Sequence, residues 1–252
     1  MNKSLIILLF FKLRLHLVLA FYTSVSLSAC FLIFNLHSFA QENVITVGIQ
    51  AKPIFRNKFF NAGNIDITQN NINFLTKPKL GFTAGMIIRK GITKKFSFET
   101  GINYVKRNYN LTITDSAFVG DSKFSIIGYE VPLLVLIYIR IGEKLYMNNA
   151  LGASIDIYKR SDKSSYDYFN LSFKRSNWLL PALLANVGWE YRTEKSGYLY
   201  FGASYHLPFT KIASMKIIYD GNNKTETIET KLAGSYLTLD LRYFFHQDPL
   251  KK

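Results

Sequence analysis

Apolar and polar residues alternate along most of the chain after residue 40, with the period of two that places successive side chains on opposite faces of a β-strand. In the last such segment, SYLTLDLRYFF, Leu237, Leu239 and Leu241 share one face, and Asp240 and Arg242 share the other. Eight segments follow this pattern. They cover residues 44–53, 79–90, 96–109, 125–140, 145–158, 177–192, 197–209 and 232–245.

The connections between these segments alternate in length. GITKK, IGEK and TEKSG form short turns, whereas the stretches at about 57–78, 110–124, 159–176 and 210–231 are long and polar and are expected to be surface loops. Each strand is long enough for the roughly 9–11 residues of a tilted membrane strand. An even strand number with short turns at one end and long loops at the other is typical of outer-membrane barrels.

We therefore predict an all-β fold, an eight-stranded antiparallel up-and-down transmembrane β-barrel, over residues 41–252, with the short turns in the periplasm. Closure of the sheet into a barrel gives every backbone N–H and C=O group inside the bilayer a hydrogen-bond partner, where no water is present to provide one. A soluble β-sandwich or barrel would also alternate, so that alternative stays open. Pro132, Pro181 and Pro208 fall inside predicted strands, where we expect bulges or strand ends because proline donates no hydrogen bond.

The N-terminal segment carries two processing signals. Lys3 and Lys12 precede an apolar run, and Ser38 and Ala40 supply small residues before a cleavage site, so residues 1–40 are predicted to be a signal peptide cleaved after Ala40. The sequence LSAC offers a second fate, lipidation at Cys30, and an uncleaved membrane helix is a third. Cys30 is the only cysteine, so the mature chain has no disulfide and no cysteine metal site.

The chain of 252 residues has a formal net charge of +14, but no run of basic residues and no phosphate-binding or metal-ligand motif. Nucleic acid is therefore excluded as a partner, and no cofactor or metal is expected. With eight strands, side chains can fill the barrel interior. Charged residues on the polar strand faces are predicted to pair there, because an unpaired buried charge is costly. This lumen set comprises Glu99, Glu130, Asp156, Glu190, Asp240, Arg89, Arg107, Arg140, Arg192 and Arg242.

The long loops carry most of the remaining positive charge, which would suit contact with anionic lipids or glycans. The basic loop set comprises Arg56, Lys58, Lys159, Arg160, Lys163, Lys174, Arg175 and Lys211. Expected partners are outer-membrane lipid, lipopolysaccharide, the barrel assembly machinery during insertion, and other envelope proteins. Catalysis would depend on His206, which shares a strand face with Ser204 but has no acidic partner placed by the sequence.

Two pieces of the chain resemble a known group. GFTAGMIIRKGITKKFSFETGINYVKR and YEVPLLVLIYIRIG are similar to the outer-membrane β-barrel families of Bacteroidota that are often called PorT-like. The resemblance implies a barrel in the outer membrane, and a role in protein secretion only for the namesake. We thus expect a non-enzymatic envelope protein with a structural or surface-binding role. A secretion subunit, a lipid-modifying enzyme using His206, and a soluble periplasmic protein or lipoprotein are the alternatives.

Overall fold

The computed structural model describes residues 44–56, 58, 62–93, 95–116, 118–158, 163–166, 169–193, 195–221 and 224–246. The predicted signal peptide, with Ala40 and Cys30, lies outside these residues. No helix within the described ranges is long and apolar enough to cross a bilayer.

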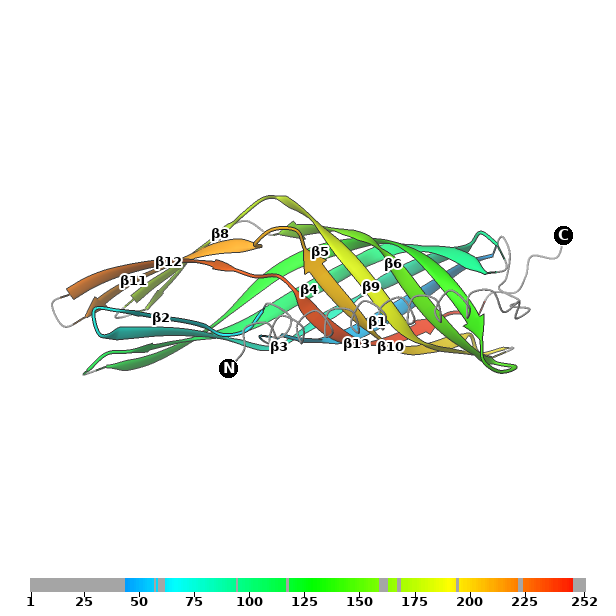
Figure 1. The fold of residues 1–252 in the computed structure, drawn as a ribbon, viewed down its shortest axis with the longest axis horizontal. Coiled ribbons are helices and arrows are strands. Elements are labelled where there is room, and N and C mark those ends of the chain that lie inside the picture. The colour runs from blue at the N-terminus through cyan, green and yellow to red at the C-terminus, as the bar shows by residue number, and fades with distance from the viewer. Residues whose placement is uncertain are drawn as a thin grey trace, which may run out of the picture. The chain divides into compact units, whose positions relative to one another are not determined.

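Eight antiparallel strands close into a ring (Figure 1). They pair in the order β1-β13-β10-β9-β6-β5-β4-β3, and the pairing of β1 with β3 closes the circle. The predicted fold class and all eight predicted strands are confirmed. The strands are β1 (Ile45–Phe55), β3 (Ile72–Gly91), β4 (Phe96–Thr114), β5 (Val119–Arg140), β6 (Leu145–Tyr158), β9 (Leu179–Arg192), β10 (Tyr198–Pro208) and β13 (Tyr236–Phe244).

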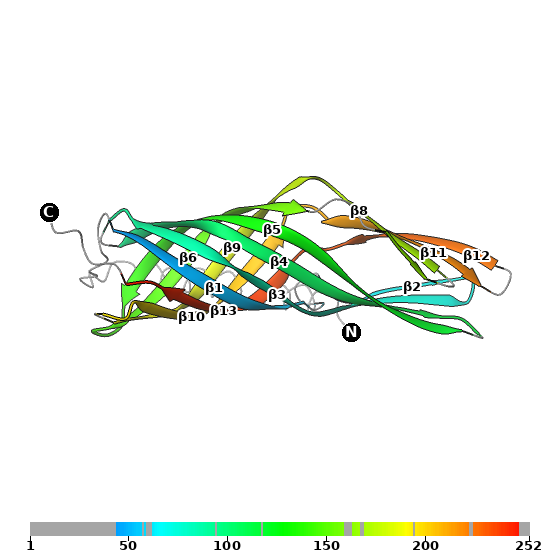
Figure 2. The same ribbon diagram turned by 180° about the vertical axis from the view of Figure 1, so that it is seen from behind.

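The long connections differ from the prediction, because they are β-hairpins and not irregular loops. β2 (Ile65–Gln69) pairs with the first part of β3, which starts earlier than expected, and β4 and β5 continue beyond their predicted limits. A separate four-stranded sheet runs in the order β12-β11-β8-β7. Its strands are β7 (Lys163–Tyr166), β8 (Phe169–Arg175), β11 (Ala213–Gly221) and β12 (Lys224–Leu232). These hairpins lie at the end of the barrel away from the short turns (Figures 1 and 2).

The hairpins pack against one another around an apolar core. Phe74 of β3 meets Tyr219 of β11 edge to face, with ring centroids 6.4 Å apart. Leu111 and Ile113 of β4 share the same buried cluster with Ile217 of β11. This two-sheet part, called the extension below, consists of the described residues within 65–78, 109–126, 163–175 and 213–232. Buried apolar contacts across two sheets make it a β-sandwich.

The barrel and the extension have opposite polarity. In the barrel, the inward positions are polar, such as Asn103 and Glu130, and the outward positions are apolar, such as Ile102. In the extension, the inward positions are apolar and outward residues such as Asp121 and Lys123 are polar and exposed. The reversal follows from the surroundings, since hydrocarbon favours apolar side chains on the outer face and water favours polar ones.

A β-bulge accomplishes the reversal in β3. Its register against β4 shifts by one residue between Lys79 and Phe82. Even-numbered residues such as Phe74 face inward before the bulge, and odd-numbered residues such as Ile87 face inward after it. An extra residue changes the face on which all later side chains lie. Gly81 occupies the bulge, where a Cβ atom would lie 2.4 Å from the carbonyl oxygen of Lys106.

The prolines behave differently from one another. Pro208 ends β10 and Pro181 lies close to the start of β9, as expected for strand ends. Pro132 lies inside β5 and pairs with Ser154 of β6, and the register with β4 is the same on both sides of it. The expected bulge at Pro132 is therefore wrong. Two ladder pairs with β4 are missing at Pro132, which lies opposite Gly101. This gap in the ladder accommodates a residue that has no backbone N–H to donate.

Exposed aromatic residues mark the two borders of the lipid-facing band. Trp189 and Tyr191 lie near the short turns, and Tyr129, Trp178 and Phe209 lie near the extension. The twelve steps from residue 179 to residue 191 rise about 40 Å along the strand, which at a tilt of about 40° spans roughly 30 Å. This height suits an outer-membrane band flanked by aromatic girdles.

Two glycines in the barrel wall are required for close packing, which gives a testable prediction. Gly188 of β9 and Gly202 of β10 pair directly, and the Tyr200 hydroxyl lies 2.4 Å and 2.3 Å from the positions of their missing Cβ atoms. Gly188→Ala should therefore cost about 1–3 kcal/mol through overpacking. The measurement is the urea midpoint of the folded protein in vesicles. Gly142→Ala is the control, because its Cβ would meet only Leu145, 3.8 Å away; equal midpoints for the two variants would contradict the prediction.

Candidate functional site

The barrel lumen near the short turns contains a continuous ion-pair cluster. Arg89 of β3 contacts Glu99 of β4 at 2.9 Å and Glu190 of β9 at 2.5 Å. Arg242 of β13 contacts Glu99 at 2.7 Å. Glu190 also accepts a hydrogen bond from Arg192, with a distance of 2.6 Å between Nε and Oε1. Charged side chains from four strands therefore meet in one cluster.

The ion-pair cluster continues through Asp240, which is fully buried. Asp240 accepts hydrogen bonds from Arg242 and Ser204, and Lys52 of β1 lies 3.2 Å from its Oδ2. Lys52 was not among the predicted lumen residues. The signal was present, since Lys52 alternates in phase with the inward-facing Gln50.

A second polar group, the His206 cluster, lies nearer the extension. The Nε2 atom of His206 lies 3.1 Å from Asp156 and 3.5 Å from Glu130. Asp156 also contacts Arg107 at 3.4 Å, and Glu130 accepts a hydrogen bond from the Tyr236 hydroxyl at 2.8 Å. The imidazole stacks on the Tyr236 ring, with centroids 4.4 Å apart.

The His206 cluster differs from a catalytic serine–histidine pair. Ser204 donates its hydrogen bond to Asp240, whereas His206 contacts Asp156 and Glu130, so the two side chains have different carboxylate partners. Glu130, Asp156 and His206 place potential ligand atoms within 4.8 Å of one another, a set that could hold a metal ion. Arg107 beside Asp156 opposes a further cation, because it already neutralises that carboxylate.

The buried charges of the lumen balance. All five predicted carboxylates lie inside: Glu99, Glu130, Asp156, Glu190 and Asp240. Five cations face them, namely Lys52, Arg89, Arg107, Arg192 and Arg242. These ten described side chains, His206 aside, therefore carry a formal charge of zero.

Arg140 is the exception among the predicted lumen residues. It lies at the end of β5, and its guanidinium donates to the carbonyl oxygens of Gly142 and Glu143 in the short turn. Its position in the alternation matches that of inward residues, but it is the last residue of β5, beside the short turn. The sequence predicts a face correctly in such a case and cannot show how far along the barrel the residue lies.

The predicted basic loop set divides into several environments. Lys58, Lys174 and Lys211 are exposed, and Lys163 belongs to β7. Arg175 donates a hydrogen bond of 2.9 Å to the Tyr158 carbonyl. Arg56 is half-buried and its guanidinium lies over the Tyr109 ring, 4.0 Å from the centroid. Lys159 and Arg160 lie outside the described residues.

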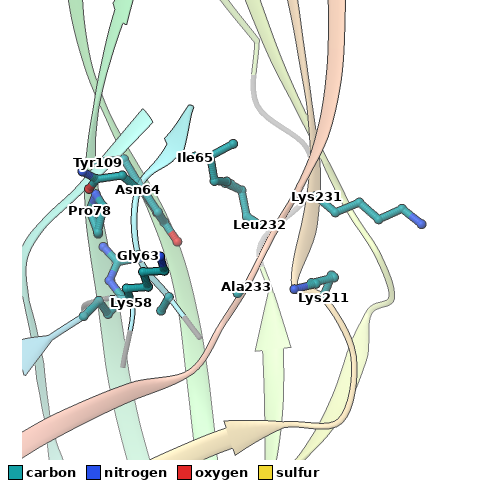
Figure 3. Close-up of a pocket in the computed structure, with 12 residues that line it drawn as sticks. Lys58, Gly63, Asn64, Ile65, Pro78, Tyr109, Lys211, Lys231, Leu232 and Ala233 are labelled. Carbon is teal, nitrogen blue, oxygen red and sulfur yellow. The ribbon is translucent and has the colours of Figure 1, made fainter. Parts of the chain in front are cut away.

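Part of the basic loop set surrounds a cavity where the extension joins the barrel. The cavity has a volume of about 670 Å³ and is lined by Arg56, Lys58, Tyr109, Lys211, Lys231 and Leu232, among others. It is called the basic opening below. In Figure 3, Lys58 and Tyr109 lie on one side of it and Lys211 and Leu232 on the other. No carboxylate is among the described residues that line it.

Comparison with known proteins agrees with this architecture. Residues 40–214 match the family described as "Outer membrane protein beta-barrel domain". A search of solved structures returned outer membrane protein OprG from Pseudomonas aeruginosa, with 11% identity over 83% of this chain and 99% of that chain and a TM-score of 0.49. Outer membrane protein AlkL has 13% identity, coverage of 84% and 94%, and a TM-score of 0.46.

A third solved structure is the outer membrane protease OmpT from Escherichia coli, with 12% identity over 84% of this chain and 99% of that chain and a TM-score of 0.36. A search of curated proteins gave no significant match. The finer resemblance to PorT-like barrels stays a prediction.

Proposed function

Because the chain belongs to the outer membrane protein β-barrel domain family, which makes it an integral outer-membrane β-barrel, we propose that it is a sealed, non-enzymatic barrel whose extension binds a ligand or partner at the cell surface. The observation that carries this proposal is the balanced set of buried charges in the lumen. Ten charged side chains from seven of the eight strands neutralise one another there, and nearly all are excluded from solvent.

The packing of the lumen supports a closed barrel. Tyr200 and Arg107 are among the largest fully buried side chains in the described part of the chain. Near the short turns, a cavity beside Arg89 and Tyr138 has a volume of only about 20 Å³, which is close to the space of one water molecule. Ions would have to displace paired side chains in order to pass.

The extension supports a binding role. It has its own apolar core, and this core holds the hairpins in fixed positions outside the lipid-facing band. A packed β-sandwich costs chain entropy to order, whereas a pure membrane anchor needs only short loops. Rigid scaffolds that present exposed segments are the usual arrangement for binding sites.

The alternatives lack such support. Full burial of His206 and its separation from the hydrogen bonds of Ser204 favour a non-enzymatic role. A secretion subunit remains a further proposal that rests on the PorT-like resemblance alone, and a stable complex with other envelope proteins on native gels would support it.

Electrical recording tests the sealed barrel. Purified protein inserted into planar phosphatidylcholine bilayers in about 1 M KCl, where the Debye length is about 3 Å, should show no lasting conductance steps, because the lumen is filled. A sixteen-stranded porin serves as the positive control. The double variant Glu99→Ser/Arg242→Ser removes two facing side chains and should introduce measurable leakage. Stable ohmic steps from the unmodified protein would contradict the sealed lumen.

A further inference from the structure

The basic opening is a gap between two strand edges. β2 and β12 are the terminal strands of the two sheets, so each has an edge without a ladder partner among the described strands. At the far tip, side chains alone join these edges, since Gln69 and Asn70 both donate hydrogen bonds to Glu226. At the base, pairing of β1 with β13 ends at Phe55 and Leu237. Between these points no ladder pair among the described strands joins β2 to β12.

Arg56 is held in this opening with spare donors. Its Nη2 atom donates to the carbonyl oxygens of Asn108 and Lys79, which flank the bulge in β3. Its Nε and Nη1 atoms are buried and have no hydrogen-bond partner. Even a half-buried guanidinium with neither a carboxylate nor a full set of acceptors is energetically costly. An anion in the opening would supply the negative charge that Arg56 lacks among the described lining residues.

Two lysines add positive charge to the same place. Lys58 and Lys211 are both exposed and line the opening from opposite sides (Figure 3). Lys231 lines it with its carbon chain, while its ammonium group points away in Figure 3. Three cations without a carboxylate among the described lining residues match a phosphate group, which guanidinium binds with two parallel hydrogen bonds.

The opening lies at the border of the lipid-facing band. Phe55, immediately before Arg56, is 40% exposed, and Phe209, two residues before Lys211, is 60% exposed. Leu80, which follows the carbonyl that Arg56 contacts, is 62% exposed. Apolar side chains this exposed fit lipid and not water. The cations next to them are therefore at the height of the lipid head groups.

From this geometry we infer that the basic opening binds the phosphate group of a membrane lipid whose head group carries a net negative charge, with Arg56, Lys58 and Lys211 as the phosphate ligands. The apolar lining on the extension side, Ile65 and Leu232, contacts the adjoining part of the lipid. The inference rests on the proposed function for one point, that the extension projects from the membrane surface. The phosphate chemistry itself could also be supplied by a soluble anion, and the experiment separates the two sources.

The test titrates the full-length protein, folded in dodecyl maltoside, with dioleoyl phosphatidic acid and counts the bound lipid by native mass spectrometry. The unmodified protein should retain one phosphatidate in preference to phosphatidylcholine. Arg56→Gln should weaken this binding about tenfold, since it removes a charge-assisted hydrogen-bond pair. Lys123→Ala is the matched control, because Lys123 is an exposed lysine on the outer face of the extension, and it should leave binding unchanged.

Gel migration before and after boiling shows whether Arg56→Gln folds. If it does not fold, the double variant Lys58→Ala/Lys211→Ala replaces it, because both of these lysines are exposed. The double variant should weaken phosphatidate binding at least fivefold. Equal retention of phosphatidylcholine, or equal weakening by Lys123→Ala, would overturn the inference. Displacement of the lipid by an equal concentration of inorganic phosphate would overturn the lipid source and assign the site to soluble phosphate. None of these outcomes alters the conductance result, so failure here is distinct from failure of the sealed barrel.

Discussion

Glu190→Gln is expected to destabilise the barrel by about 3–5 kcal/mol, the usual cost of breaking a buried ion pair by removing one partner. Glu190 is completely buried and forms ion pairs with both Arg89 and Arg192. Glutamine keeps the shape but leaves two guanidinium groups with one fewer negative charge. The measurement is the urea midpoint in phosphatidylcholine vesicles, followed by gel migration without boiling.

The control for Glu190→Gln is Glu143→Gln. Glu143 lies exposed in a short turn, and only its backbone carbonyl accepts a hydrogen bond, from Arg140, so the substitution should change the midpoint very little. The double variant Glu190→Gln/Arg192→Gln should recover part of the loss, because it removes the cation that Glu190→Gln leaves without its carboxylate, whereas Arg89 keeps Glu99. If Glu190→Gln and Glu143→Gln unfold at the same urea concentration, the lumen charges are solvated and the ion-pair cluster is not a seal.

Leu111→Ala is expected to loosen the extension while leaving the barrel folded. Leu111 of β4 has no exposed surface and packs in the apolar core between the two sheets. Truncating a buried leucine typically costs about 2–5 kcal/mol, as transfer energy and a cavity. Hydrogen exchange in the segments 109–126 and 213–232 should therefore become faster, whereas exchange in the barrel strands should not change.

The control for Leu111→Ala is Leu133→Ala. Leu133 of β5 lies on the outer face of the barrel and is 42% exposed in the isolated protein, so it contacts lipid and not the extension core. This variant should leave exchange in the extension unchanged. Similar acceleration in both variants, or a loss of heat-modifiable gel migration by Leu111→Ala, would mean that the extension has no separate core and unfolds together with the barrel.

The two predictions probe opposite solutions to the same problem. Inside the bilayer the protein places polar groups in its interior, so it must neutralise them, as Arg89 and Glu190 do. Beyond the bilayer the same strands β3, β4 and β5 bury apolar groups such as Leu111. The bulge at Gly81 allows β3 to take part in both arrangements, since it exchanges the inward and outward faces of that strand.

The sequence by itself determined the eight barrel strands and most of the lumen residues. Alternation with a period of two is a local property of the chain. Each strand residue faces either lipid or the packed lumen, so the face of Glu99 or Asp240 follows from its neighbours along the chain. The same reasoning places Lys52 with Gln50, although it was not assigned there. Arg140 shows the limit of this reasoning. The alternation predicts its strand face correctly, but it does not predict that the residue lies at the end of the barrel beside the short turn.

Only the tertiary structure decided that the polar connections form a packed sandwich. In these segments the apolar inward-facing residues alternate with many polar residues, so the sequence of the segments resembles that of solvated loops. It also decided which distant residues meet. His206 lies beside Asp156 and Lys52 beside Asp240, contacts that depend on ring closure and on the tilt of strands far apart in sequence. Arg56 is half-buried at the basic opening for the same reason, since its surroundings come from a bulge in β3 and from β4. Charge type and strand face are properties of a sequence, whereas the depth of a residue along a barrel is a property of the closed sheet.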